Sequence, residues 1–587
     1  MQVSFLVPVY NTDPAVLRLC VNSVLKAAGQ AHEVVMVDDG SDRAETQEFL
    51  DRCDEAGIDQ LQVIRNSGNH GVSFSLNQAA DAASGNFLAP VDHDDVVVTQ
   101  GFHQMLRGLT YFGSPWAYSD EIQVDANGFL IRRMFKPDYS PQLLRSLMYI
   151  NHLQVFSKEL FEQLGGYREG FEGSQDYDLA LRMSERCTPL HIEEIAYHWR
   201  ILEQTQSRSG EQLSASSVDS GLRALEEHFA REQFPAVVEP VLFKRHAHTE
   251  PEPIGVYRSR LVDNEPRRLS VIIPCRLGTT KQINNRPLVL LEHCLQSLSR
   301  SFVDTEKDRV EIVLVLNAED DIQKGEEAIA RHGLTGVAIT DGPGFNFSRK
   351  CNLGAQQANG DVLIFLNDDT DMQTRGWVAD VIALLSEEDV ACVGGLMQNN
   401  DRTVQSCGDN VGRDSAVHYV PEPGADGVGD AMHRYLADHE TTSISGAFLC
   451  TQKAVFEELG GFSHAFPNSF QDVDFCLRAR ARGMRCITSP GIRLLHFESA
   501  TRDAEVDYAT LSAFRSYHGP GLAGKDPYAF WRYQPIHFSL FSYNGIKFRL
   551  YQVAKIFVDR ARRIEKACTR RPRCWRGVLK RSEHRVV

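Results

Sequence analysis

The chain has 587 residues, of which 42% are hydrophobic and 24% are charged. This is the composition of a globular protein, and the length predicts three or four domains, or two large ones with extensions. The net charge of −16 argues against general nucleic-acid binding, because an acidic surface repels phosphates.

Thirteen cysteines are scattered along the chain without any C-x-x-C pair. This argues against a zinc ribbon or a disulfide framework and favours a reducing compartment. We expect no signal peptide, because the N-terminus lacks a basic segment followed by a long apolar run. No stretch approaches the roughly 20 apolar residues that a spanning helix needs. The expected location is therefore cytoplasmic.

The first 95 residues are expected to form an α/β unit. The runs VSFLVPV (3–9) and EVVMVD (33–38) are short and rich in valine, which is typical of buried parallel strands. Residues 15–28 between them have apolar side chains at helical spacing, completing a β-α-β unit. A small-residue helix ending at Gly85 and a strand over 86–92 follow. The acidic residues 92–95 thus fall at the carboxyl end of a strand, the edge where open α/β sheets bind ligands.

A long-period repeat relates the two halves of the chain. Residues 3–11 match 269–276, residues 33–40 match 311–318, and residues 72–95 match 345–369. A Gly-Gly-aromatic turn followed by Gln-Asp-x-Asp occurs twice, as QDYDLALR from 175 and as QDVDFCLR from 471. The matched positions are Asn77 and Asn352, Gly85 and Gly360, Asp94 and Asp369, Asp176 and Asp472, and, in AYHWR and LLHFES, His198 and His496. The order of these landmarks predicts two related domains in tandem.

The predicted fold class is α/β with two such domains, at 1–245 and 269–520. A linker rich in proline and charge joins them at 246–268, and a basic helical extension follows at 521–587. From Lys547 to Arg585 there are 14 Lys or Arg and three Asp or Glu residues. Three interpretations of this tail stay open: a solvated helix, a peripheral contact with the anionic inner membrane face, and a contact with a partner protein.

Two motifs are expected to carry the chemistry. VDHDD (91–95) and LNDDT (366–370) place carboxylates at strand ends, where they could bind a hard divalent cation, Mn²⁺ or Mg²⁺, or merely cap the next helix. The first Asp of Gln-Asp-x-Asp opens a helix, where it could be a cap or a general base. Because both motifs recur at matched positions, the duplication favours a metal site and a base in each domain.

These motifs resemble those of family 2 glycosyltransferases with a GT-A fold, over about 1–205 and 269–503. The first domain, through FKPDYSPQLLRS, LGGYREGF, SQDYDLALR and YHWR, is similar to bacterial enzymes that build capsule, O-antigen and other surface polysaccharides. The second, through SISGAFLCTQKAVFEELGGF, QDVDFCLRARARG and HFESATRD, resembles a rhamnosyltransferase-like subgroup. The resemblance implies a nucleotide-diphospho-sugar donor (UDP, dTDP or GDP), a divalent metal, inversion at the anomeric carbon, and an oligosaccharide or lipid-linked glycan acceptor.

The resemblance also implies roles for individual residues. Asp176 and Asp472 would be the catalytic bases. The metal would be held by Asp94, His198, Asp369 and His496. The nucleotide-sugar would contact Asp39, Asp92 and Asp368, with Asn317 at the position of Asp39. Arg349 could reach the donor diphosphate, and Arg182 and Arg478 are expected to be structural ion-pair partners on their helices.

The leading interpretation is a bifunctional inverting glycosyltransferase acting on a bacterial surface glycan. One alternative keeps one domain catalytic and makes the other an acceptor-binding module. Another is a nucleotidyltransferase, which would normally show a Gly-rich phosphate loop near the first strand, and none is evident. A non-catalytic scaffold would leave the paired motifs unexplained.

Overall fold

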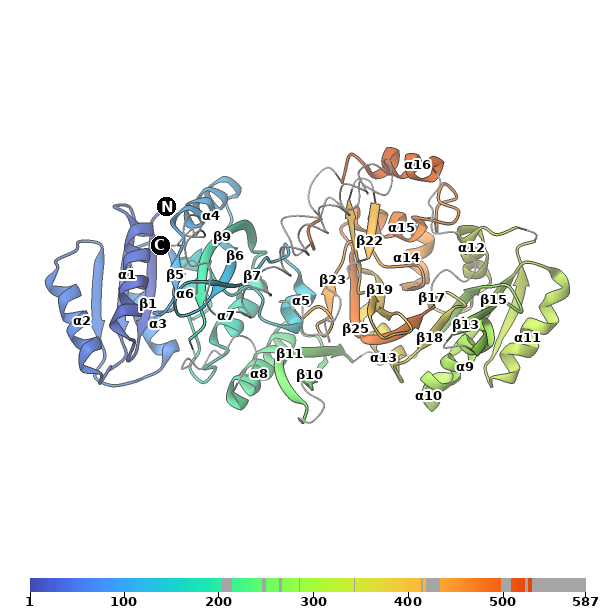
Figure 1. The fold of residues 1–587 in the computed structure, drawn as a ribbon, viewed down its shortest axis with the longest axis horizontal. Coiled ribbons are helices and arrows are strands. Elements are labelled where there is room, and N and C mark those ends of the chain that lie inside the picture. Colours follow the sequence, from blue (N-terminus) through green and yellow to red (C-terminus); the bar gives the residue numbers. More distant parts are fainter. Residues whose placement is uncertain are drawn as a thin grey trace, which may run out of the picture.

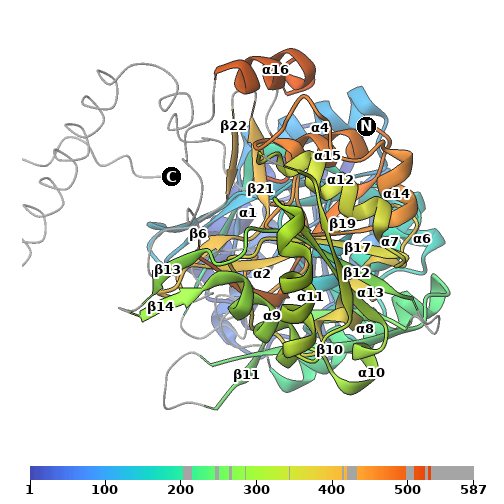
Figure 2. The same ribbon diagram turned by 90° about the vertical axis from the view of Figure 1, so that its right-hand side faces the viewer.

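The structure is a computed structural model that describes residues 1–202, 214–244, 250–262, 267–283, 286–342, 344–412, 415–418, 433–497, 508–522 and 526–529. Two α/β domains lie side by side along its longest axis (Figure 1), with α5, α8 and the β10–β11 hairpin between them. In the view along that axis the second domain lies in front of the first (Figure 2).

Nine strands form the sheet of the first domain, and helices flank it. The strands are β1 (Val3–Val9), β2 (Glu33–Asp38), β3 (Leu61–Arg65), β4 (Phe87–Pro90), β5 (Val96–Val97), β6 (Trp116–Val124), β7 (Leu130–Met134), β8 (Gln154–Ser157) and β9 (Leu190–Arg200). The helices are α1 (Pro14–Ala28), α2 (Ala44–Glu55), α3 (Val72–Ala82), α4 (Thr99–Phe112), α5 (Pro141–Ser146), α6 (Lys158–Gln163), α7 (Gln175–Ser184) and α8 (Ala215–Arg231).

The second domain has a ten-stranded sheet and two additional hairpins. Its strands are β12 (Leu269–Pro274), β13 (Thr280–Ile283), β14 (Arg286–Val289), β15 (Val310–Leu316), β16 (Gly336–Thr340), β17 (Val362–Leu366), β18 (Thr370–Met372), β19 (Val390–Gln398), β20 (Val404–Ser406), β21 (Asp409–Gly412), β22 (Ser415–His418), β23 (His439–Glu440), β24 (Phe448–Gln452) and β25 (Arg485–His496). Its helices are α9 (Leu290–Ser301), α10 (Asp304–Lys307), the 3-10 helix η1 (Glu319–Asp321), α11 (Ile322–Arg331), α12 (Phe347–Gln357), α13 (Trp377–Leu385), α14 (Lys453–Glu458), α15 (Gln471–Arg480) and α16 (Tyr508–His518).

The two main sheets have the same strand order. It is β3-β2-β1-β4-β8-β6-β9-β5 in the first domain and β16-β15-β12-β17-β24-β19-β25-β18 in the second. In both, the first four strands are parallel and the next strand, β8 or β24, runs antiparallel to β4 or β17. The prediction of two tandem α/β domains of the GT-A type is therefore confirmed, and both acidic clusters follow the fourth strand of their sheet.

The opening β-α-β unit shows why the sequence folds in this way. All seven residues of β1 are buried, as expected for a strand covered by helices on both faces. Helix α1 begins with Pro14 after Asp13, whose carboxylate accepts a hydrogen bond from the Ala15 N–H at 2.8 Å, so it is capped at its start. Its buried side chains recur at helical spacing from Leu17 to Val24.

The segment predicted as an irregular linker, 246–268, contains strand β11 (Glu252–Leu261), which pairs antiparallel with β10 (Ala236–Phe243). Ile254, Val256 and Tyr257 of this strand are buried in a core of the first domain. The prolines and charges obscured the alternation of apolar residues, because a strand bent by a bulge loses its simple period of two. The connection between the domains thus includes a hairpin that packs on the first domain.

A buried network of charges joins the two domains. Arg485 of β25 binds Glu440 at 2.9 Å and Glu387 at 2.6 Å, and Glu387 also binds Arg145 of α5 at 2.9 Å. Glu440 accepts hydrogen bonds from Ser140 and from the Gln142 N–H at the start of α5. The helix N-terminus and two arginines therefore compensate the buried glutamates across the interface.

The predicted basic extension lies almost entirely outside the described residues. Of the part that is described, Pro527 accepts a hydrogen bond from the Asp138 N–H at 2.8 Å, and Asp526 accepts one from the Val411 N–H at 2.7 Å. This short segment therefore contacts both domains. Within the described ranges, none of the helices has the length and apolarity needed to cross a membrane.

We expect Arg485→Ala to destabilise the protein strongly, because it leaves Glu440 and Glu387 buried without their main partner. The expected loss is about 3–5 kcal/mol of unfolding free energy. It would be measured by urea unfolding of the whole chain, followed by its intrinsic fluorescence. The control is Arg482→Ala, which removes an exposed pair with Glu458 and should cost at most about 1 kcal/mol. Equal losses in the two variants would contradict the importance of the network.

Candidate active sites of the two domains

In each domain, an asparagine holds the Gly-Gly-aromatic turn in place, a contact that we call the asparagine clamp. This asparagine lies on the helix before the strand that leads to the acidic cluster. Asn77 on α3 donates to the Tyr167 carbonyl and accepts from the Tyr167 N–H, both at 2.8 Å. Asn352 on α12 makes the same two bonds with Phe462, at 2.8 and 2.9 Å. The second glycine of each turn has a positive φ, and an added Cβ would lie within 2.7 Å of the asparagine Oδ1. Only glycine fits there.

The two aspartates of Gln-Asp-x-Asp have different surroundings. The second one, Asp178, is fully buried and binds Arg182 at 2.7 Å, and Arg182 also donates to the carbonyls of Leu164 and Gly166. Asp474 and Arg478 repeat this arrangement at 2.8 Å. The prediction that both arginines are structural ion-pair partners is confirmed. The second aspartate thus fixes the helix to the turn, and the first one remains for chemistry.

In the first domain, the acidic cluster is joined by a histidine that sequence reasoning did not single out. Ligand atoms of Asp92, Asp95 and His152 all lie within 4.8 Å of one another. Asp95 is 1% exposed, and its Oδ2 has no hydrogen-bond partner. Burial raises the pKa values of Asp94 and Asp95, and neighbouring carboxylates add to both shifts. A concentration of negative charge of this kind, next to an imidazole, suits a divalent cation.

Asp176 lies at the start of α7, near this cluster. One of its carboxylate oxygens accepts a hydrogen bond from the Tyr177 N–H at 2.8 Å. Burial raises the pKa of Asp176, the charge of Asp92 adds to the shift, and His152 opposes it. A raised carboxylate pKa makes a stronger base, which is what proton abstraction from a hydroxyl requires.

In the second domain, Asp369 and His496 lie together. The His496 Nε2 is 3.2 Å from the Asp369 Oδ1, and its Nδ1 lies 2.8 Å from the Gln405 Oε1. Burial raises the pKa of Asp368 to about 7, and the charge of Asp369 adds to the shift. The structure thus gathers three of the residues predicted for the second site: Asp368, Asp369 and His496.

Asp472 at the start of α15 is held more firmly than Asp176. Its Oδ2 accepts from the Gly446 N–H at 2.6 Å and its Oδ1 from the Val473 N–H at 2.9 Å. Burial raises its pKa, and the charge of Asp409 adds to the shift. Ala447, which follows Gly446, accepts a hydrogen bond at its carbonyl from the Asn367 N–H, next to Asp368. The loop at Gly446 and Ala447 therefore links the candidate base Asp472 to the acidic cluster.

The predicted equivalence of His198 and His496 is not matched by the strand registers. His496 ends β25 and pairs with Thr370, next to Asp369. His198 lies two residues before the end of β9 and pairs with Val96. The end of β9 is Arg200, which donates from its Nε to the Asp94 carbonyl and from its N–H to the Asp95 carboxylate. The similar sequences around the two histidines, AYHWR and LLHFES, concealed this shift in strand register.

The corners predicted to receive the nucleotide base differ between the copies. Asp39 is 4% exposed and accepts hydrogen bonds from Asn66 and from the N–H groups of His70 and Gly71. In the second domain the residue types are exchanged: Asn317 takes the place of Asp39, and Asp341 that of Asn66. The Asn317 Oδ1 and the Asp341 Oδ2 have no hydrogen-bond partner. The second corner therefore holds one buried, unpaired acceptor on each of these two side chains, whereas the first is largely satisfied internally.

Arg349, predicted to reach the donor diphosphate, bonds through its Nε to the Asp341 carboxylate at 2.5 Å. It therefore lies at the corner of the second domain that is predicted to receive the nucleotide base. Asp341 and His152 were missed because each follows or precedes a strand without an acidic neighbour in the sequence. Aligning the strand ends of the two copies would have identified Asp341, whereas the position of His152 is occupied by Ala447 in the second copy.

Comparisons with known proteins agree with this organisation. The model of glycosyl transferase family 2 matches residues 4–164 and 270–410. The O-antigen biosynthesis protein RfbC of Myxococcus xanthus is 30% identical over 541 residues, 90% of this chain and 40% of that protein. Chondroitin synthase of Escherichia coli is 27% identical over 220 residues, 37% of this chain and 30% of that protein. This chain thus spans less than half the length of these two relatives.

Among solved structures, S. aureus TarS 1-349 in complex with UDP-GlcNAc aligns with a TM-score of 0.32 and 18% identity, over 39% of this chain and 66% of that chain.

Replacing either clamping asparagine should destabilise its own domain. We expect Asn77→Ala and Asn352→Ala each to cost about 1–3 kcal/mol, because a donor and an acceptor of the turn lose their partner. Asn→Asp at the same positions keeps the acceptor and should cost less. Urea denaturation monitored by hydrogen exchange would assign each loss to one domain. A loss spread evenly over both domains would contradict the local role of the clamp.

Proposed function

Because the chain belongs to glycosyl transferase family 2, whose model matches more than half of its residues, we propose that each of its two domains transfers a sugar from a nucleotide-diphospho-sugar to a glycan. The enzyme class predicted from the sequence, a glycosyltransferase, is confirmed by that membership. The observation that carries the proposal is the pair of sites: identical strand order brings an acidic strand end and an aspartate at a helix start to the same edge of both sheets.

Asp176 and Asp472 are the proposed general bases. The acceptor hydroxyl has a pKa far above 7, so a carboxylate must take its proton as the new bond forms. Attack on the face opposite the departing diphosphate would invert the anomeric carbon with no covalent intermediate. Burial, which raises both pKa values, makes each carboxylate more basic.

A divalent cation is proposed at both sites, and the cluster of three close ligands at the first site supports it. In the second domain Asp369 and His496 would hold it. In the first, Asp92, Asp95 and His152 supply the close ligand atoms, and the Asp95 Oδ2, which accepts no hydrogen bond, is available to bind a metal. Asp94 lies beside them, whereas His198, the sequence-predicted ligand, is displaced along β9. When bound, Mn²⁺ or Mg²⁺ would offset the charge that develops on the diphosphate.

The donor nucleotide is proposed to enter near Asp39 in the first domain and Asn317 in the second. The buried acceptors of Asn317 and Asp341 suit a base that donates N–H groups. Because the first corner is satisfied internally, the two domains are proposed to differ in nucleotide preference. The acceptor is proposed to be a bacterial surface glycan, free or lipid-linked, as the similarity to RfbC suggests, at a cytoplasmic site. Membrane contact through 547–585 concerns residues that the structure does not describe.

A second candidate function makes the second domain an acceptor-binding module. Two observations favour it: both oxygens of Asp472 are hydrogen-bonded to backbone N–H groups, and the position of His152 holds Ala447. A carboxylate engaged in this way is less available as a base.

The decisive test compares Asp176→Asn with Asp472→Asn. If both domains are catalytic, each variant should lose one linkage by about 100-fold or more, as expected on removal of a general base, and keep the other. Products formed from UDP-, dTDP- and GDP-sugars with Mn²⁺ would be identified by mass spectrometry and linkage analysis. Unaltered products from Asp472→Asn, with an intact fold, would instead support the binding module.

His152 and His198 provide a test of the metal site. In an Asp472→Asn background, we expect His152→Ala to raise the Mn²⁺ concentration for half-maximal transfer more than about tenfold. His198→Ala should change it little, because its neighbours Tyr197 and Trp199 face His152 and successive side chains of a strand point to opposite faces. A larger effect of His198→Ala than of His152→Ala would instead support His198, the ligand predicted from the sequence.

A further inference from the structure

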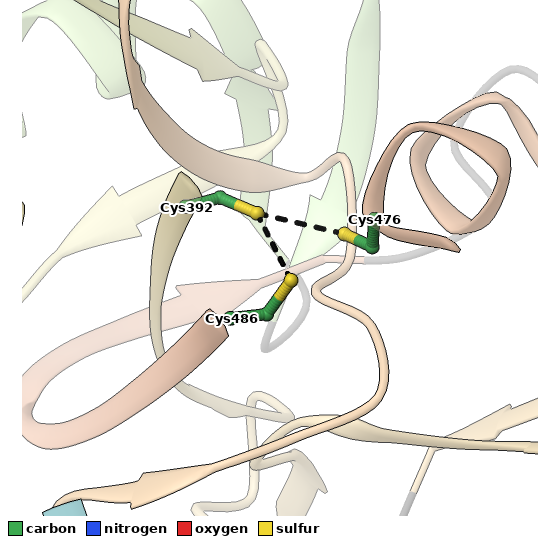
Figure 3. Close-up of side chains that lie close together, drawn as sticks. All are labelled: Cys392, Cys476 and Cys486. Carbon is green, nitrogen blue, oxygen red and sulfur yellow. Dashed lines mark hydrogen bonds between the residues drawn. The ribbon is translucent and has the colours of Figure 1, made fainter. Parts of the chain in front are cut away.

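Three cysteines from separate elements meet in the core of the second domain. Cys392 lies on β19, Cys476 on α15 and Cys486 on β25, and their side chains point toward one another (Figure 3). The Cys392 sulfur lies 3.4 Å from that of Cys486 and 3.7 Å from that of Cys476. All three sulfurs lie within 4.8 Å of one another, and each residue is at most 1% exposed.

The fold does not require three thiols at this place. The first domain has the same strand order, yet its matching segments, 116–118 on β6, residue 180 on α7 and 189–191 at the start of β9, contain no cysteine. Ala180, at the position of Cys476, is fully buried. The same architecture therefore closes its core without sulfur, so the convergence of three cysteines in the second copy calls for a chemical reason.

The spacing of the sulfurs suits a metal ion. For a triangle with the two measured sides and a third side up to 4.8 Å, the central point lies about 2.0–2.4 Å from each corner. A zinc–thiolate bond is about 2.3 Å long. We propose that Cys392, Cys476 and Cys486 form a three-thiolate site for Zn²⁺ in the core of the second domain.

Charge favours Zn²⁺ over Cu⁺, the other ion that thiolates select. Binding would break three S–H bonds, form three Zn–S bonds and release three protons. The resulting unit carries a net charge of −1, whereas Cu⁺ would leave −2. One cation, Arg480 on α15, acts electrostatically on Cys486 and can offset a single negative charge. Because an uncompensated buried charge is costly, the zinc unit is the better match.

The site would join the elements that bear the second candidate active site. Helix α15 begins at Gln471, next to Asp472, and carries Cys476 one turn further on. Strand β25 begins near Cys486 and ends with His496. An ion bound to Cys476 and Cys486 would therefore fix the position of the helix relative to the strand. The site is distinct from the proposed Mn²⁺ or Mg²⁺ site, which has oxygen and nitrogen ligands.

The test is the metal content of the full chain, purified without chelators from zinc-supplemented cells. We expect about one zinc ion per chain in the wild type, and less than about a tenth of that in Cys476→Ala. This variant places in α15 the residue that the first domain uses. The control, Cys450→Ala, removes a buried cysteine outside the cluster and should retain the metal. Replacement by Co²⁺ should produce a thiolate-to-cobalt absorption band in the wild type and in the control.

Three results would overturn the proposal. One is a wild-type chain without zinc that also takes up no Co²⁺. Another is full zinc content in Cys476→Ala, which would place the metal elsewhere. The third is a metal-free chain in which two thiols fail to react with a thiol reagent after denaturation, which would indicate a disulfide within the cluster. None of these readouts depends on transfer activity, so they are independent of the proposed function.

Discussion

The asparagine clamp is the constraint on which both candidate sites depend. In each domain one side-chain amide connects the helix before the acidic strand to the turn before the Gln-Asp-x-Asp helix. These two segments are about 90 residues apart in the first domain and 110 in the second. One of them leads to the proposed metal ligands and the other to the proposed base. Since proton abstraction depends on the distance between base and acceptor, a fixed bond between the two supports couples the two halves of the site.

Much of the sequence repeat serves this frame. The glycine matched at 85 and 360 donates its N–H to Ser4 in one copy and to Ser270 in the other. Each serine in turn bonds a glutamate of the second strand, Glu33 or Glu311. The frame thus ties the first, second and fourth strands together at the edge opposite the acidic cluster. The second aspartate of Gln-Asp-x-Asp belongs to the same frame, because it binds the arginine four residues later, which donates to the carbonyls of the Gly-Gly turn. A repeated motif therefore does not by itself identify catalytic residues. In Gln-Asp-x-Asp, the second aspartate pairs with an arginine, and only the first is a candidate for catalysis.

The sequence was sufficient to predict the opening strands of each domain, the tandem repeat and the place of the acidic clusters, because valine-rich runs and helical periods reflect burial directly. It failed where the answer depends on register or on contacts between distant segments. The shift between His198 and His496 arises from how two strands pair, and a shift in pairing changes which side chain meets the partner strand's acidic neighbour. His152 approaches Asp92 only because β8, which follows it, pairs antiparallel with β4, which precedes Asp92. The hairpin strand β11 was missed because its bulge and prolines disturb the alternation of apolar residues.

The two domains have diverged in their polar corners while the frame was kept. A swap of aspartate and asparagine between two neighbouring strand ends leaves the backbone unchanged, since the two side chains have nearly the same shape. It does move the negative charge from the second strand to the third and leaves acceptor atoms of Asn317 and Asp341 open. Where the polar side chains of a corner bond only to their own loop, as around Asp39, a nucleotide would be selected mainly by shape. Where buried acceptors have no partner, as in Asn317 and Asp341, a base without matching N–H donors would bind less well. Divergence of this kind would change donor specificity without disturbing the position of either base.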